Sequence, residues 1–500
     1  MGKPNWWKTA CAVFLLCAAT AIALPAQTFT TVHSFDKTDG ANPLAALVQA
    51  TNGALLGTTQ SGGANHFGTI FRITPSGTLT KLYDFCSQGG SSCTDGSSPK
   101  AGLVQATDEN FYGTTFSGGA NNNNEFCSST GCGTIFKITP SGTLTTLYSF
   151  CAQSGCTDGT EPIAGLVQAT DGNFYGTTGR VGANGLGGTV FMITPGGTLT
   201  TLYSFCSQSG CADGKFPEAA LIQATDGNFY GTTDGGGVND MGTVFKITPG
   251  GTLTTLYRFC AQSGCTDGEL PQGALVQAAD GNFYGTTFSG GANHNNNFCD
   301  SAGCGTIFKI TPSGMLATLY SFCAQSGCTD GTEPVAGLVQ ATDGNFYGTT
   351  PNGGSPTDVG TVFNITPSGT LTTLHILGSQ SGDGFFPVAA LVQDTDGNLY
   401  GTTSSGGANG DGTVFSLSVS LGPFVETQRT FGKVGMAVKI LGTNLTGATS
   451  VSFNGTAATF TVVSSSLITT SVPSGATTGT VQVVTPSGTL SSNVPFRVLP

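Results

Sequence analysis

Short runs of apolar, β-branched and aromatic residues, separated by turn-forming residues, follow one another along almost the whole chain. Between residues 164 and 205 the four runs are AGLVQAT, NFYGTT, GTVFMIT and TLTTLYSF. Asp-Gly separates the first two runs and Pro-Gly-Gly the last two, and both are turn signals between paired strands. After the N-terminal leader, no segment keeps the 3.6-residue apolar period of a helix. The pattern predicts an all-β protein made of four-stranded units.

This four-run unit occurs seven times. TDGNFYGTT recurs unchanged at Thr170–Thr178, Thr225–Thr233 and Thr342–Thr350, and Gly-Thr-Thr marks seven copies spaced 53 to 63 residues apart. Repeats of this length with several strands each are typical of β-propellers. The runs do not alternate cleanly between apolar and polar residues, which fits sheets that are covered on both faces.

The two ends of the array indicate that it closes on itself. The seventh copy contains the third run, Gly412–Ser418, but lacks the fourth, whereas Thr28–Phe35 is a fourth-type run that precedes the first copy. An open array would leave both ends as unpaired edges. We therefore predict a seven-bladed β-propeller closed by the N-terminal strand, with an open solenoid as the alternative.

The repeat also carries a family resemblance. The blocks LVQATDGNFYGTT and GTIFKITPSGTLTTLYSF resemble the GloVer tandem repeat of exported bacterial proteins. The resemblance covers about residues 28–421, and we place the propeller domain at residues 27–421. It implies export and a repeat architecture, and it implies no activity.

A second, smaller domain follows at residues 422–500. Its short strands alternate apolar and polar residues, which predicts a small β-sandwich. The stretches Gly442–Gly455 and Val472–Gly488 are similar to IPT/TIG immunoglobulin-like domains. That resemblance implies a spacer or interaction module.

The first 26 residues predict a signal peptide. Lys3 and Lys8 form a positive region, Ala10–Leu24 is the apolar stretch, and cleavage is expected after Ala26. The alternative is a retained membrane anchor, although the apolar run is shorter than the roughly 20 residues that a span needs. We expect a secreted, extracellular protein that does not insert into a membrane once the signal is removed, and association with the cell surface stays open.

Cysteine usage supports export. Two of the 16 cysteines lie in the leader, and the others occur as close neighbours in the sequence. An even number at regular spacing in an exported chain predicts disulfides, whereas zinc sites usually have shorter spacing or histidine partners. The expected pairs are Cys86–Cys93, Cys127–Cys132, Cys151–Cys156, Cys206–Cys211, Cys260–Cys265, Cys299–Cys304 and Cys323–Cys328.

Charge excludes some partners. The chain carries 28 acidic and 16 basic residues, with a net charge of −12 and no basic cluster after the leader. Nucleic acid and anionic membrane surfaces are therefore poor partners. Both tryptophans, Trp6 and Trp7, lie in the leader, which weakens the case for sugar binding without closing it. The oligomeric state is not predicted.

Candidate binding residues lie at one end of the predicted sheets. The loops before each first strand and the loops between second and third strands emerge at the same end, carry all the expected disulfides and vary in length. We call this end the loop face and expect binding there, with loop pinning against proteolysis as the alternative. The candidates in the two longest loops are Asn121, Asn122, Asn123, Asn124, His294, Asn295, Asn296 and Asn297.

An Asp-Gly pair recurs in the loops before the first strands. Carboxylates around the mouth of a ring could hold Ca²⁺, although the Asp-Gly pairs are also ordinary turn formers. The Ca²⁺ candidates are Asp95, Asp158, Asp213, Asp267 and Asp330. We expect no other cofactor.

No nucleophile motif, zinc-protease pattern or phosphate loop occurs in the sequence. We therefore expect a non-enzymatic binding or adhesion protein, whose ligand is an extracellular glycan or a surface protein. One alternative is an extracellular polysaccharide hydrolase or lyase, because propellers can bring carboxylates together from different blades. The other is a structural surface or matrix protein without a discrete ligand.

Overall fold

The computed structural model describes residues 27–88, 93–123, 125–127, 130–295, 297–299 and 302–499. The predicted signal peptide, Asn124 and Asn296 lie outside these residues. The all-β prediction is confirmed: four-stranded antiparallel sheets make up the described chain, and helix is limited to short 3-10 turns. These turns are η1 Ser154–Cys156, η2 Ser209–Cys211, η3 Ser263–Cys265 and η4 Ser326–Cys328.

In the described part of the chain, the repeats form seven four-stranded sheets, numbered here in chain order. Sheet 1 contains β2 Val48–Gln49, β3 Leu55–Thr59, β4 Thr69–Ile73 and β5 Leu79–Asp84. Sheet 2 contains β6 Val104–Gln105, β7 Phe111–Thr115, β8 Thr134–Ile138 and β9 Leu144–Ser149. Sheet 3 contains β10 Val167–Gln168, β11 Phe174–Thr178, β12 Thr189–Ile193 and β13 Leu199–Ser204.

The later repeats follow the same order. Sheet 4 contains β14 Ile222–Gln223, β15 Phe229–Thr233, β16 Thr243–Ile247 and β17 Leu253–Arg258. Sheet 5 contains β18 Val276–Gln277, β19 Phe283–Thr287, β20 Thr306–Ile310 and β21 Leu316–Ser321. Sheet 6 contains β22 Val339–Gln340, β23 Phe346–Thr350, β24 Thr361–Ile365 and β25 Leu371–Ile376.

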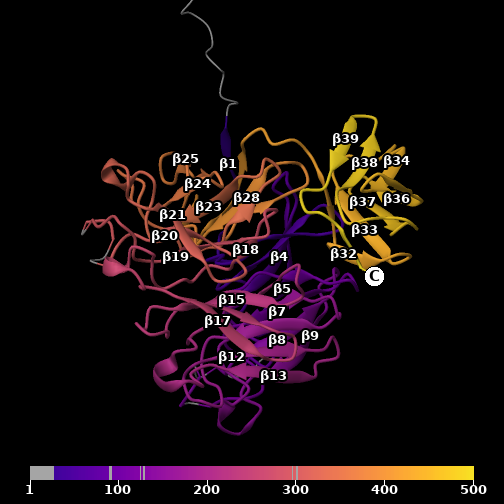
Figure 1. The fold of residues 1–500 in the computed structure, drawn as a ribbon. Helices are drawn as coiled ribbons and strands as arrows, with labels where there is room; N and C mark the ends of the chain where they lie inside the picture. The colour runs from indigo at the N-terminus through magenta and orange to yellow at the C-terminus, as the bar shows by residue number, and fades with distance from the viewer. Residues whose placement is uncertain are drawn as a thin grey trace, which may run out of the picture.

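Sheet 7 joins the two ends of the repeat array. It contains β27 Val392–Gln393, β28 Leu399–Thr403, β30 Thr413–Ser418 and, from the N-terminus, β1 Thr28–Ser34. β1 runs antiparallel to β30, with Thr28 opposite Ser418 and Ser34 opposite Thr413. Figure 1 shows the indigo β1 beside the orange strands of this sheet. The N-terminal strand therefore pairs where the sequence predicts.

Apolar clusters link each sheet to the next and sheet 7 back to sheet 1. The cluster that closes the series contains Phe35, just after β1, with Phe71 of sheet 1 and Tyr400 and Val414 of sheet 7. The Phe35 and Phe71 rings meet edge-on with their centroids 5.1 Å apart. The same contact joins Phe85 of the first repeat to the next sheet, through the ring of Phe136 at 5.4 Å. The core is thus a series of equivalent inter-sheet layers.

Side-chain hydrogen bonds follow the same closed course. The glutamine of each first strand accepts a bond from a backbone N–H of the preceding sheet, at 2.8–3.2 Å, and Gln49 of sheet 1 does so from Thr395 of sheet 7. The first threonine of each Gly-Thr-Thr donates to a carbonyl of the following sheet, ending with Thr402 to Ala45. Buried polar groups need such partners, so each sheet supplies hydrogen-bond partners for polar groups of its neighbours.

The first strands and their turns differ from the sequence expectation. We predicted Ala164–Thr170 as a strand followed by a two-residue turn. The strand β10 pairs only at Val167–Gln168, and Ala169 still bonds to Asn173, which leaves three residues in the connection. Gly172 ends that connection at a φ of 86°. This is a three-residue hairpin loop with glycine in the left-handed position.

The glycine of Gly-Thr-Thr is required by close packing. A Cβ atom on Gly176 would lie 2.7 Å from Phe191 Cζ and 2.9 Å from Leu166 Cδ2. The phenylalanine ring of the third strand covers this position, so any larger residue would displace it.

The C-terminal residues form two further four-stranded sheets around a core of their own. One contains β31 Val425–Thr427, β33 Ala437–Gly442, β37 Leu467–Ser471 and β36 Phe460–Ser464, and the other contains β35 Thr456–Ala458, β34 Ser450–Phe453, β38 Val481–Thr485 and β39 Gly488–Ser491. Among the same residues, β32 Phe431–Lys433 pairs with β40 Arg497–Leu499. In the repeats, one further short pair joins β26 Gly384–Phe385 to β29 Ser405–Gly406.

The C-terminal sheets contact the end of the repeats opposite the loop face (Figure 1). Their hydrogen-bond partners there lie in connections between first and second strands. Ser466 Oγ donates to the Thr51 carbonyl at 3.3 Å, Gln428 Nε2 to the Ala106 carbonyl at 3.0 Å, and Arg497 to the Thr225 carbonyl. The loop face is therefore free of these contacts.

Within the described ranges, no helix has the length and apolar character that crossing a membrane would require.

Closure can be tested with one matched pair of variants. Phe35 and Phe85 are both fully buried and make the same edge-on contact with the next sheet. Substituting either by alanine removes a buried ring and should cost about 3–5 kcal/mol of unfolding free energy. We expect Phe35→Ala to be as damaging as Phe85→Ala in urea unfolding, although Phe35 lies next to the terminal strand. A loss below about 1 kcal/mol for Phe35→Ala alone would contradict closure of the ring.

Candidate functional site

The loop face is built from two loops of each repeat that pair with each other. In the third repeat, Thr160 of the loop before the first strand bridges Arg180 of the loop between the second and third strands. Equivalent bridges join Ser97 to Ser117 and Lys215 to Gly235. Both kinds of loop therefore lie at the same end of the sheets, as the strand order predicts.

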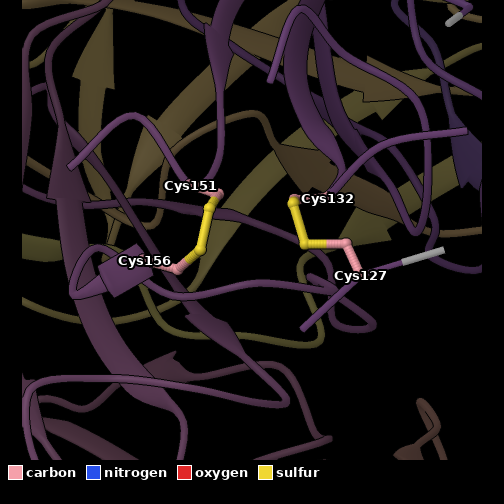
Figure 2. A group of neighbouring side chains, drawn as sticks. All are labelled: Cys127, Cys132, Cys151 and Cys156. Carbon is pink, nitrogen blue, oxygen red and sulfur yellow. A yellow bond between two sulfur atoms is a disulfide. The ribbon is translucent and has the colours of Figure 1, made fainter. Parts of the chain in front are cut away.

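Disulfides join the expected cysteine pairs in these loops. Among the described residues they are Cys86–Cys93, Cys127–Cys132, Cys151–Cys156, Cys206–Cys211, Cys260–Cys265, Cys299–Cys304 and Cys323–Cys328. Cys127–Cys132 of the second repeat and Cys151–Cys156 of the third face each other, and their four sulfur atoms lie within 4.8 Å of one another (Figure 2). Because each sulfur is bonded to another, these cysteines serve here as cross-links and not as thiolate ligands.

The asparagine-rich loops use several of their predicted binding side chains internally. Asn121 donates to the Ser149 and Phe150 carbonyls, at 2.8 and 3.1 Å. Asn123 donates to Cys156 Sγ and Asn295 to Cys328 Sγ, each at 3.5 Å. These three residues hold the long loops against the disulfide-bearing loops. Among the described members of the set, Asn122, His294 and Asn297 are exposed.

The loop aspartates considered for Ca²⁺ are almost fully buried and accept hydrogen bonds. In the third repeat Asp158 accepts from the Tyr148 hydroxyl at 2.8 Å and from the Ala152 N–H at 2.9 Å. The tyrosine–aspartate bond recurs at 2.8 Å for Asp95, Asp213, Asp267 and Asp330. In the remaining two copies His33 and His375 replace the tyrosine and contact Asp39 and Asp383. This geometry fits the interpretation of these aspartates as turn formers, because each carboxylate accepts hydrogen bonds that hold its own loop.

One group of side chains breaks the sevenfold pattern of the loop face. The residue after the loop proline is apolar at Leu44, Ile163, Val335 and Val388, but it is Lys100 in the second repeat, Glu218 in the fourth and Gln272 in the fifth. Around these three lie Glu161, Arg180 and Asp234. We call the six residues Lys100, Glu161, Arg180, Glu218, Asp234 and Gln272 the charged cluster.

Ion pairs and ring contacts hold the charged cluster in place. Arg180 Nε lies 3.1 Å from Glu161 Oε2, and Gln272 Nε2 donates to Asp234 Oδ1 at 3.0 Å. The Lys100 ammonium lies 3.5 Å from the centre of the Phe116 ring, and the Arg180 guanidinium lies over Phe216. Such cation–ring contacts fix both partners at a partly dry surface.

Burial perturbs the acids of the charged cluster. It raises the pKa of Glu218, and the Asp234 carboxylate adds to that rise, while Arg180 and Lys100 oppose it. Burial also raises the pKa of Asp234, against the Gln272 hydrogen bond and the Lys215 charge. The same desolvation lowers the pKa of Lys100. Perturbed acids grouped with cations are characteristic of binding and catalytic sites.

Sequence reasoning missed this cluster. It did not single out Lys100, Arg180 or Asp234. The signal was present at the position after the proline, where the side chain changes from apolar to charged or polar within an otherwise regular repeat. The sequence does not show that these variable positions from neighbouring repeats lie close together. Their proximity follows from the packing of the sheets.

A second departure from the pattern lies at the opposite end, under the C-terminal sheets. Asp394 occupies the position that is alanine in the other six repeats, and it is 1 % exposed. Its Oδ1 accepts a bond from Gln49 Nε2 at 2.8 Å, whereas its buried Oδ2 has no partner within the described chain. Burial raises the pKa of Asp394 to about 7, and the carboxylates of Asp396 and Glu426 add to the rise.

Comparison with known families gives a match over most of the chain. The model described as the Gloeobacter/Verrucomicrobia repeat matches residues 19–125, 91–299 and 266–463. The resemblance to the GloVer repeat is thereby confirmed. A search of curated proteins finds no match.

Similarity to solved structures is distant. A protein of unknown function from Bacteroides thetaiotaomicron is 14% identical, with a TM-score of 0.41 over 79% of this chain and 76% of that one. A putative 6-phosphogluconolactonase from Bacteroides uniformis is 15% identical, with a TM-score of 0.42 over 66% of this chain and 83% of that one. A fungal alcohol oxidase in complex with copper is 13% identical, with a TM-score of 0.48 over 95% and 99%.

Asp394 generates a prediction about pH. An unfolded chain gives this carboxyl its ordinary pKa of 3.8, so the folded protein holds the proton more tightly. The contribution to stability is complete below about pH 4 and is lost as the pH rises toward 7, at a cost of no more than about 4 kcal/mol. Asp394→Asn keeps an acceptor for Gln49 and should flatten this part of the profile, measured by urea unfolding between pH 4 and 8.

The control for that experiment is Glu125→Gln, which removes a carboxylate from an exposed loop position. It should retain the parent's pH dependence. If Asp394→Asn lost stability with rising pH as steeply as the parent, the buried-acid explanation would be wrong.

Proposed function

The chain belongs to the Gloeobacter/Verrucomicrobia repeat family, and from this premise we propose that its repeats form a seven-bladed β-propeller over residues 27–421. Two observations support the proposal. β1 completes the sheet that contains β30, and an apolar cluster joins that sheet to the first one. Each repeat sheet is then one blade, and the short first strands line the centre.

The C-terminal residues 422–500 are proposed to be an immunoglobulin-like sandwich of the IPT/TIG type. Two four-stranded sheets enclose a core that includes Ile440, Phe453, Ile468 and Val483. Antiparallel sheets packed over such a core are the architecture of that class. In this position the module covers one end of the propeller and leaves the loop face open.

We propose that the protein is an extracellular, non-enzymatic binding protein whose binding surface is the loop face. The observation that carries this proposal is the charged cluster, which interrupts the repeat symmetry on a surface of cross-linked loops. Variable side chains on a rigid scaffold are where binding usually resides. The disulfides of these loops are consistent with an oxidising, extracellular location.

A glycan fits the chemistry of the charged cluster. A sugar hydroxyl both donates and accepts hydrogen bonds, so a site for sugars needs both kinds of group. Glu218 and Asp234 supply acceptors, and Arg180 and the Gln272 amide supply donors. Phe216 is half-buried beside Arg180. It offers an aromatic surface to a sugar ring, which a tryptophan could otherwise provide. A surface protein that presents the same groups remains an outcome of the test.

One observation favours a second candidate, a polysaccharide hydrolase or lyase. Glycoside cleavage needs two carboxyls in different protonation states, and Glu218 and Asp234 are neighbouring acids whose pKa values are both raised. The third candidate, a structural matrix protein, would leave the charged cluster without a ligand.

The test combines a glycan array with an assay for the release of reducing sugar. We expect the parent protein to bind selected glycans without releasing sugar. The double variant Glu218→Gln, Asp234→Asn should weaken binding by about tenfold or more, because each lost charged hydrogen bond is worth roughly 1.5–3 kcal/mol. The matched control is Glu333→Gln, at the position equivalent to Glu161 but outside the charged cluster.

Three results are decisive. Release of sugar that disappears in the double variant would replace the proposal with the hydrolase or lyase. Binding of a surface protein but of no glycan would keep the loop face and change the ligand class. Unaltered glycan binding by the double variant, with folding confirmed by its unfolding midpoint, would remove the charged cluster from the site.

A further inference from the structure

A cavity of about 680 Å³ lies between the first strands of sheets 3–6 and the C-terminal residues. It is at the end of the propeller opposite the loop face, so it is separate from the surface proposed above. Its volume falls within the range of small-molecule sites, roughly 300–1,000 Å³.

Most of the cavity wall is apolar. The first strands contribute Val167, Ile222 and Val276, and the C-terminal residues contribute Phe431 and Val494. Val494 is 45% exposed and lies at the cavity lining. A wall of this composition gains free energy by covering an apolar molecule.

The glutamine amides that reach the cavity are already engaged. Gln223 Oε1 accepts the Thr170 N–H at 2.8 Å, and its Nε2 donates to the Gly227 carbonyl at 3.1 Å. The glutamines next to it in the ring, Gln168 and Gln277, repeat this arrangement. These amides hold the sheets together and contribute little hydrogen-bonding capacity to a ligand.

One cationic side chain from the C-terminal end is available to a ligand. Arg497 donates through Nη1 to the Thr225 carbonyl, and a guanidinium has five N–H donors. Asn493 also lines the cavity, but its Oδ1 is buried and out of reach of a ligand.

The charge of the lining is one-sided. Arg497 is its single cation, and no carboxylate occurs among the described residues that line it. This contrasts with the chain as a whole, in which 28 acidic residues outnumber 16 basic ones. A partly enclosed cation beside apolar walls complements an anion that carries an apolar body.

We propose that this cavity is a binding site for a small amphipathic anion. The anionic group pairs with Arg497, and the apolar body lies along Val167, Ile222 and Val276. Both domains contribute to the site, so an occupied cavity also ties the C-terminal sheets to the propeller.

Two fluorescent probes of nearly the same shape test the proposal. 8-Anilino-1-naphthalenesulfonate has an apolar ring system, one N–H and a sulfonate, and N-phenyl-1-naphthylamine is its uncharged counterpart. We expect saturable binding of the sulfonate by the folded protein. Arg497→Gln should weaken the sulfonate by about tenfold, equivalent to roughly 1.4 kcal/mol, and change the affinity for the neutral probe less than twofold. Arg497→Lys should recover part of the loss.

Filling the cavity provides the second measurement. Val494→Trp places a large side chain into the cavity from an exposed position, so it should abolish binding of both probes with little effect on the unfolding midpoint. The controls are Val463→Trp, which adds tryptophan at an exposed position outside the lining, and Arg429→Gln, which removes another C-terminal arginine. Both controls should bind the probes as the parent does.

Two results would overturn the proposal. One is sulfonate binding that Val494→Trp leaves intact, because the probe would then lie elsewhere. The other is an equal loss of both probes in Arg497→Gln, because the arginine would then shape the cavity and would not pair with the anion.

Discussion

Every sheet of the repeat array depends on its neighbour for both apolar cover and hydrogen-bond partners. A first-strand glutamine takes the N–H of one adjacent sheet, and a Gly-Thr-Thr threonine gives its hydroxyl to the other. A sheet at an open end would lack one of these partners and would expose a face of phenylalanine and tyrosine. The contacts of Gln49 with Thr395 and of Thr402 with Ala45 join the last sheet to the first. They therefore supply the partners that the two end sheets would otherwise lack.

That dependence explains why most of the repeat is uniform and where it can vary. Residues between the sheets, such as Phe191 and Gly176, pack so closely that a Cβ atom added to Gly176 would lie only 2.7 Å from Phe191 Cζ. Loop positions such as those of Glu218 and Asp234 are outside this packing. They can carry different charges in neighbouring repeats without disturbing the sheets, so a site that needs several kinds of side chain can be assembled from them.

The sequence was sufficient for the features that repeat. Seven copies of one pattern specify the strands, the cysteine pairs and the displaced terminal strand, because each copy confirms the others. It was insufficient where the outcome depends on three-dimensional neighbours. The first strands were expected to be longer than Val167–Gln168, and the turns after them to be shorter. The observed strands end early because residues around Asp171 form local hydrogen bonds and do not continue the pairing. Asn121 and Asn123 looked available in the sequence but bond to adjacent loops. The residues of the charged cluster and Asp394 each differ from the repeat pattern at one position. Only the packing of the sheets shows which of these residues lie next to one another.

The position of β1 has a consequence for the order in which the molecule can form. Thr31 lies opposite Phe415, so β1 cannot pair until one of the last strands of the array is in place. Loop-closure entropy and the many non-local pairings make such a step slow. Until it occurs, a folding chain has an unpaired strand edge at each end of the array, and a second folding chain could supply the missing strand. Exchange of β1 between two molecules is the characteristic error to which this topology is exposed.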